Sequence, residues 1–279
     1  MKKYILLLAL MVVSASALIV YVSDYAAREE KARPAPVREV AEKSIEEIVK
    51  AVGPSVVAIN TKERLLIRSR ARDPILRYFG GRSDFLAETE GIGSGVICDP
   101  KGYVLTNGHI VGSAQEIQVT LADGRQFDAT LCAMDRERDL ALIKLDEKQL
   151  PAAEFGYSGN ISAGQWVVAF GNPFGTASQG AQPSVSAGVI SALHRNLKVA
   201  GGRIYRDLIQ TDAAINSGND GGPLVDLSGR VIGLNTLILT SSGASTGMGF
   251  AIPIDLVKEA LDDMKRQCLR KRGGKGAKS

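Results

Sequence analysis

A succession of short apolar segments, each ended by a turn, constrains the fold of this chain more than any other feature. The segments are rich in Val, Ile and Leu, and Asp123-Gly124 inside one of them is a strong hairpin signal. Thirty glycines and ten prolines supply the turns. The pattern predicts an all-β fold of antiparallel strands, built as a sandwich or as barrels, and roughly 220 residues are enough for two small barrels. The segments are 55–61, 93–99, 103–107, 117–135, 140–145, 165–171, 183–193, 208–214, 222–239 and 248–254.

A short helix is expected at each end of this strand-rich region, which spans 44–265. Ser44 and Glu47 form a capping-box pattern at the start of the first helix, and Gly53-Pro54 ends it. Apolar residues at helical spacing predict an amphipathic helix over 255–267. The charged stretch 64–90 is expected to form a flexible loop. The basic end, 266–279, is predicted to be disordered, with contact to anionic lipid as the alternative.

The N-terminus carries an export signal. Lys2 and Lys3 precede an uncharged apolar run over 4–22. In one interpretation the run is a signal peptide cleaved near Ala17, and in the other, 1–23 is an uncleaved signal anchor in the inner membrane. Both interpretations place the body of the chain in the periplasm, after a linker over 24–43. The charge of +4 is mild, and we expect no nucleic-acid partner.

Three cysteines, Cys98, Cys132 and Cys268, match no zinc-site spacing. Cys98 and Cys132 both fall in predicted strands, where buried thiols are common. An exported location would also permit a disulfide between Cys98 and Cys132, and the sequence leaves the two possibilities open.

Three residues suggest nucleophilic chemistry. A general base that works near neutral pH must be histidine, and the chain has only two, of which His109 follows a strand in a small-residue setting. Asp139 immediately precedes a buried strand, and Asp220 lies in the glycine loop "NSGNDGGPLV". A histidine, then an aspartate, then a nucleophile loop is a known chain order for a catalytic triad.

The segments "GSGVICDPKGYVLTNGHIV", "RDLALIKL", "VVAFGNPFG", "SAGVISAL", "LIQTDAAINSGNDGGPLVD" and "GMGFAIPIDLVK" resemble the protease domain of the HtrA/Deg family of trypsin-like serine endopeptidases. The resemblance covers 44–265 in order. It implies two six-stranded antiparallel β-barrels, a site between them and a homotrimeric assembly. "DPILRYFGG" also resembles the regulatory loop of that family. No PDZ domain follows the last helix in this sequence, so we expect no regulation through one.

The resemblance assigns roles by position. His109 matches the general base, Asp139 the residue that orients it, and Asp220 the nucleophile. The backbone N–H groups of Gly218 and Asp220 match the oxyanion hole. The resemblance places the substrate pocket at Ala214, Ile215 and Asn235, with no acidic residue at its base, which implies a preference for small or aliphatic side chains. No cofactor is implied.

Asp220 departs from the family, which has serine at this position. A carboxylate has no proton to give to a base near neutral pH, and it places a negative charge where the oxyanion must form. Two flanking carboxylates also favour the protonated form of His109, which cannot then act as a base. The sequence therefore predicts a protease homologue that does not cleave peptide bonds.

Three functions follow from these observations. The leading hypothesis is a pseudoprotease that binds unfolded or extended polypeptide, as a homotrimer or as a partner of an active homologue. The second is an active endopeptidase whose natural form has serine at position 220. The third is a divalent-metal site made by His109, Asp139 and Asp220, which offer one nitrogen and two carboxylate ligands.

Overall fold

The computed structural model describes residues 43–70, 82–173, 182–199, 202–238 and 247–275. The first six strands form a closed antiparallel barrel in the order β1-β2-β3-β6-β5-β4. Asp123-Gly124 joins β4 to β5, as the hairpin signal predicts. The strands are β1 (Val56–Arg70), β2 (Arg82–Asp99), β3 (Tyr103–Asn107), β4 (Glu116–Thr120), β5 (Gln126–Asp135) and β6 (Leu140–Leu145).

The second half of the chain forms another antiparallel sheet, whose strand order β10-β11-β12-β9-β8-β7 also closes. The predicted all-β class is thus confirmed, and so is the C-terminal helix. The strands are β7 (Trp166–Gly171), β8 (Ser184–Lys198), β9 (Ile204–Thr211), β10 (Pro223–Asp226), β11 (Val231–Ile238) and β12 (Gly249–Pro253).

The hydrophobic core joins the two sheets. Each sheet has its own buried cluster, and a third, larger cluster contains Leu105 and Leu142 of the first sheet together with Phe170 and Leu234 of the second. Burial of one such side chain stabilises the fold by about 1.5–3 kcal/mol. The shared cluster fixes one sheet against the other, which matters because the candidate site takes residues from both.

Within the described residues, three α-helices accompany the sheets. The helix α2 (Ile45–Val52) has the predicted capping box, in which the Ser44 hydroxyl accepts from the Glu47 N–H and the Glu47 carboxylate accepts from the Ser44 N–H. The single turn α4 (Gly108–Val111) follows β3, and α5 (Ile254–Lys275) ends the described chain. The predicted disorder from 266 onward is wrong as far as Lys275, because α5 continues to that residue.

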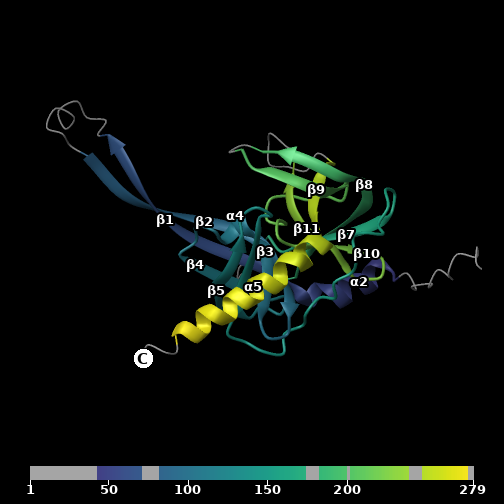
Figure 1. Cartoon of the computed structure of the whole chain (residues 1–279), viewed down its shortest axis with the longest axis horizontal. Helices are drawn as coiled ribbons and strands as arrows, with labels where there is room; N and C mark the ends of the chain where they lie inside the picture. The colour runs from purple at the N-terminus through teal and green to yellow at the C-terminus, as the bar shows by residue number, and fades with distance from the viewer. Residues whose placement is uncertain (1–42, 71–81, 174–181, 200–201, 239–246, 276–279) are drawn as a thin grey trace, which may run out of the picture. The chain divides into compact units, whose positions relative to one another are not determined.

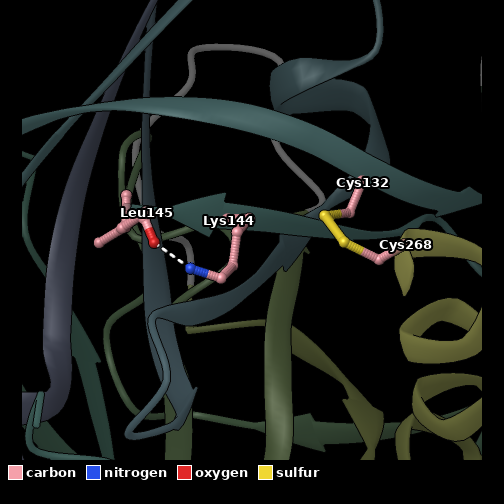
Figure 2. The surroundings of a disulfide bond; sticks show 4 residues. All are labelled: Cys132, Lys144, Leu145 and Cys268. Carbon is pink, nitrogen blue, oxygen red and sulfur yellow. Dashed lines mark hydrogen bonds between the residues drawn. A yellow bond between two sulfur atoms is a disulfide. The ribbon is translucent and has the colours of Figure 1, made fainter. Parts of the chain in front are cut away.

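The helix α5 touches β5 and β6 of the first sheet as well as β11 and β12 of the second (Figure 1). A disulfide between Cys132 on β5 and Cys268 on α5 attaches it covalently (Figure 2). Of the two possibilities that the sequence left open, a Cys98–Cys132 disulfide is excluded, because Cys132 pairs with Cys268 and Cys98 is free. The strand β2, which carries Cys98, is not a neighbour of β5 in the sheet. Burial raises the pKa of the free Cys98 thiol to about 12, so it is unreactive.

The strands β1 and β2 continue well beyond the barrel as a two-stranded arm (Figure 1). Their register runs without interruption from Val56 opposite Val96 to Arg70 opposite Arg82. The expected loop over 64–90 is therefore wrong for most of its length. Opposite charges face one another at the base of the arm, where Arg64 Nε lies 3.7 Å from Glu88 Oε1. Cross-strand pairs of opposite charge favour strand pairing.

Several predictions fall on parts of the chain outside the described residues. These are the signal segment 1–23, nearly all of the linker 24–43, and the segment 73–81 that resembles a regulatory loop. Of the helices that are described, none combines the length and the apolar character required to cross a bilayer.

Candidate active site

His109 is placed by the junction of β3 and α4. The strand ends at Asn107, and the chain turns into α4 so that His109 faces the start of β6. The His109 N–H donates to Asp139 Oδ1 at 2.9 Å, and His109 Nδ1 lies 2.6 Å from Asp139 Oδ2. Backbone and ring are thus both fixed on one carboxylate, which leaves Nε2 as the nitrogen that faces the site.

Asp139 is fully buried and has a backbone φ of 59°, an unusual value for a residue other than glycine. Its carbonyl accepts from the Gly108 N–H at 2.9 Å and from Asn107 Nδ2 at 3.2 Å. These bonds hold the turn before β6 against the end of β3. The backbone of Asp139 is therefore held in a strained conformation that aims its carboxylate at His109.

Two residues of the second half of the chain, Arg203 just before β9 and Tyr205 on it, also bind Asp139, and sequence reasoning missed both. Arg203 Nη1 donates to Asp139 Oδ1 at 2.6 Å, and the Tyr205 hydroxyl donates to Asp139 Oδ2 at 2.7 Å. Burial alone would raise the pKa of Asp139, but the bonds and charges of His109, Tyr205 and Arg203 outweigh it and hold that pKa below its usual value. No spacing motif marks Arg203 or Tyr205, because their partner lies far away in sequence.

Asp220 lies in the loop before β10, opposite the imidazole. Its Oδ2 is 3.9 Å from His109 Nε2, and its side chain is 26% exposed. Its Oδ1 is buried and, among the described residues, has no hydrogen-bond partner. The structure therefore brings all three predicted triad positions together, with His109 between Asp139 and Asp220.

Glycines shape the loop that carries Asp220. Gly218 and Gly221 have φ values of 95° and 82°, which favour glycine. A Cβ atom at Gly221 would lie 2.3 Å from the Ser94 carbonyl oxygen, so a side chain cannot fit. The loop thus keeps the sharp turn that would expose a nucleophile, although the residue at its apex is an aspartate.

Ser94 on β2 clamps the same loop from the first sheet. Its N–H donates to the Asp220 carbonyl at 2.8 Å, and its hydroxyl donates to the Gly218 carbonyl at 2.5 Å while accepting from the Asn172 N–H at 2.7 Å. The carbonyls of the two residues whose N–H groups are expected in the oxyanion hole are thereby held by one fully buried serine, which fixes the loop on the far side of those N–H groups. Sequence reasoning missed Ser94, which sits inside the strand segment "GSGV" without a motif of its own.

A test of this clamp uses the Asp220→Ser background, in which turnover can be measured. Adding Ser94→Ala should lower kcat about 10- to 100-fold with little change in KM, because it removes the hydroxyl that holds the Gly218 carbonyl and so loosens the loop that carries the expected oxyanion hole. Steady-state kinetics on an unfolded substrate would give both constants. A rise in KM at unchanged kcat would instead assign Ser94 to substrate binding.

The charges in the site favour a protonated imidazole. Burial would lower the pKa of His109, but Asp139 and Asp220 outweigh it and raise that pKa from 6.5 to about 9. Because the folded value is the higher one, the stabilisation is complete below pH 6.5 and is lost as pH rises through about 9. At neutral pH this shift favours the imidazolium form of His109, which is a proton donor.

An NMR titration of the histidine ring protons tests directly whether the two carboxylates raise the pKa of His109. We expect His109 to titrate near pH 9 in this chain and at a clearly lower pH after Asp220→Asn, which removes one carboxylate and keeps the shape. His194, outside the site, provides a control resonance that should not respond to the substitution. A His109 midpoint that is the same in both proteins would show that Asp220 does not hold the proton.

The residues expected in the substrate pocket differ in accessibility. Ala214 is exposed, and its carbonyl accepts from the Ser186 hydroxyl at 2.8 Å. Ile215 and Asn235 are fully buried, and Asn235 Nδ2 donates to the Phe170 carbonyl at 3.0 Å. Of the three, only Ala214 offers surface to a ligand.

The geometry does not fit the metal alternative. His109 lies between the two carboxylates, with Nδ1 on Asp139 and Nε2 toward Asp220, so the three donors do not converge on one point. Asp139 is already bound by Arg203 and Tyr205. Within the described ranges, no cluster of three or more His, Cys, Asp or Glu residues is arranged to hold an ion.

Comparison with known proteins identifies the family. Residues 93–234 match a family model described as a trypsin-like peptidase domain. The chain is 38% identical over 251 residues to a probable periplasmic serine endoprotease, DegP-like, of Pseudomonas savastanoi pv. phaseolicola, covering 82% of this chain and 51% of that protein. It is 44% identical over 186 residues to Protease Do-like 1, chloroplastic, of Arabidopsis thaliana, covering 66% and 41%. The chain thus spans about half the length, or less, of these two relatives.

Comparison with solved structures identifies the same family. A variant of the HtrA-type protease AlgW with a decapeptide superposes with a TM-score of 0.71 at 40% identity, over 80% of this chain and 67% of that one. AlgW itself with a decapeptide gives a TM-score of 0.65 at 39% identity, over 81% and 68%. The chain therefore belongs to the family of trypsin-like peptidase domains and is a homologue of the HtrA/DegP-type serine endoproteases.

Proposed function

We propose that this chain is an exported pseudoprotease that binds extended or unfolded polypeptide in the former substrate cleft without hydrolysing it. The observation that carries the proposal is the carboxylate of Asp220 at the nucleophile position, 3.9 Å from His109 Nε2. A carboxylate attacking an amide would form a mixed anhydride and expel a poor leaving group. The protonated His109 would also be unable to accept a proton.

Binding is supported by the parts of the site that remain. The glycine loop is held in place by Ser94, and Ala214 is exposed and so available to a ligand. Extended peptide can pair through its backbone with an exposed segment beside the second barrel, in the manner of strand addition. The related AlgW structures hold a tripeptide or a decapeptide, which is the ligand class proposed here.

The cellular setting is proposed on the same basis. Relatives are named periplasmic endoproteases, and the apolar N-terminal run fits export with an inner-membrane anchor, or secretion after cleavage near Ala17. The family resemblance suggests that the chain forms a homotrimer or associates with an active homologue. Either assembly would hold the chain close to unfolded polypeptides in the periplasm.

Fluorescence anisotropy with a labelled unfolded polypeptide, run beside gel electrophoresis of the same mixtures, tests binding and cleavage together. We expect saturable binding and an intact polypeptide. Ala214→Trp should weaken binding by blocking the cleft, whereas Ala51→Trp on the exposed face of α2 should not. Cleavage by the purified chain that disappears with His109→Ala would show that the site is active. Equal binding by both tryptophan variants would place the ligand elsewhere.

A further inference from the structure

We propose that Asp220 and His109 form a nucleophile and acid pair that opens epoxides, with Asp220 becoming esterified. This chemistry goes beyond peptide binding and does not depend on it. A carboxylate attacks amides poorly, but it is an effective nucleophile at a saturated carbon that carries a strained leaving group. The same two side chains that fail as a protease pair are suited to this other electrophile.

The nucleophile is accessible and is not occupied by other contacts. Asp220 Oδ2 faces the imidazole, and about a quarter of the side chain is open to solvent, so a small molecule can reach it. Oδ1 is buried and accepts no hydrogen bond from any described residue. A carboxylate is ionised at neutral pH, and a carboxylate with few donors around it retains more of its nucleophilicity than a fully hydrogen-bonded one.

The acid is oriented by its other partners. His109 Nδ1 is held by Asp139 at 2.6 Å, so the N–H of the imidazolium at Nε2 faces Asp220. The separation of 3.9 Å between Nε2 and Oδ2 is too long for a hydrogen bond between them. In-line attack on an epoxide carbon about 3–3.5 Å from Oδ2 places the ring oxygen beyond that carbon, and the oxygen comes within reach of the Nε2 proton once the Asp220 carboxylate moves outward from its present 3.9 Å separation. The pKa of about 9 keeps that proton on His109 at neutral pH.

The first step conserves atoms and charge within the site. A bond forms between Asp220 Oδ2 and the ring carbon, the ring carbon–oxygen bond breaks, and the ring oxygen takes the proton from His109 Nε2. The products are a hydroxyalkyl ester of Asp220 and a neutral His109.

The neutral imidazole can then act as a base, which the imidazolium could not. Held by Asp139, it accepts a proton from a water molecule that attacks the ester carbonyl. The vicinal diol leaves, and the carboxylate and the imidazolium are restored. One epoxide and one water give one diol, without oxidant, reductant or metal.

The test uses the full chain with an aryl glycidyl ether as the epoxide, in ¹⁸O-labelled water. Peptide mapping by mass spectrometry should find the ester on Asp220 if hydrolysis is slow, or ¹⁸O in the Asp220 carboxylate if it is fast. Asp220→Asn should abolish both signals, and His109→Gln should reduce their rate about 10²-fold, the scale of general acid catalysis. Asp128→Asn, which changes an exposed carboxylate on β5, should leave labelling of Asp220 unchanged.

Circular dichroism melting of each variant separates a chemical effect from unfolding. Absence of both ester and ¹⁸O at Asp220, or labelling at Asp220 no greater than at Asp128 in the unchanged chain, would overturn the proposal. An unchanged rate in a folded His109→Gln variant would also overturn it, because the ring opening would then need no imidazolium. None of these outcomes bears on whether the cleft binds polypeptide.

Discussion

Asp220→Ser should convert this chain into a working endopeptidase, with cleavage of an unfolded polypeptide on the order of 10⁴-fold or more above that of the unchanged protein. We expect this because the other parts of the triad site are already in place. His109 is held on Asp139 by two bonds, and the loop around position 220 is already clamped by Ser94. Loss of the nucleophile alone removes most of the catalysis of a triad, so its return should recover a comparable factor.

Removal of the carboxylate has a second effect on the same variant. The pKa of His109 is raised partly by Asp220, so Asp220→Ser should return the imidazole toward the neutral form that accepts the serine proton. Initial rates on a fluorescein-labelled unfolded protein would measure the gain. Asp220→Asn is the matched control: it removes the charge and supplies no hydroxyl, and it should stay inactive. A folded Asp220→Ser protein without activity would show that Asp220 is not the only obstacle to catalysis.

Loss of the disulfide should produce the largest change in stability. Cys132 and Cys268 are separated by 136 residues, and cross-links that close long loops restrict the unfolded chain strongly. Removal of a native disulfide typically costs 2–5 kcal/mol. Cys132→Ser combined with Cys268→Ser should therefore lower the free energy of unfolding by about that amount, as measured by urea denaturation.

Reduction provides an independent control. A reductant should destabilise the unchanged chain as much as the double substitution does, and it should have no further effect on the double variant. Cys98→Ala should keep the full response to reductant, because Cys98 is free. Thiol titration of the denatured, unreduced protein should find one thiol. Three thiols before reduction, or equal urea midpoints with and without reductant, would contradict the cross-link.

Local sequence signals anticipated the parts of the fold that depend on neighbouring residues. The capping box at Ser44 and the Asp123-Gly124 hairpin are each a contact between residues a few positions apart, and both are present. The three triad positions come together as expected, since their spacing follows a family pattern.

Contacts between distant segments could not be anticipated in the same way. The Cys132–Cys268 bond, the Arg203–Asp139 ion pair and the Ser94 clamp each join segments that only the tertiary fold brings together. The β1–β2 arm differs from the predicted loop for a different reason. Its charged residues have the composition of a loop, and their pairing across the two strands was not visible in either strand alone.

The row of charged groups from Arg203 through Asp139 and His109 to Asp220 alternates in sign. With serine at position 220 and a neutral imidazole, the row would hold one cation and one anion. With aspartate it holds two of each, because the added carboxylate recruits a proton from solvent onto the ring. Asp220→Ser should therefore leave the net charge of this row unchanged, because the carboxylate and the proton on His109 are lost together.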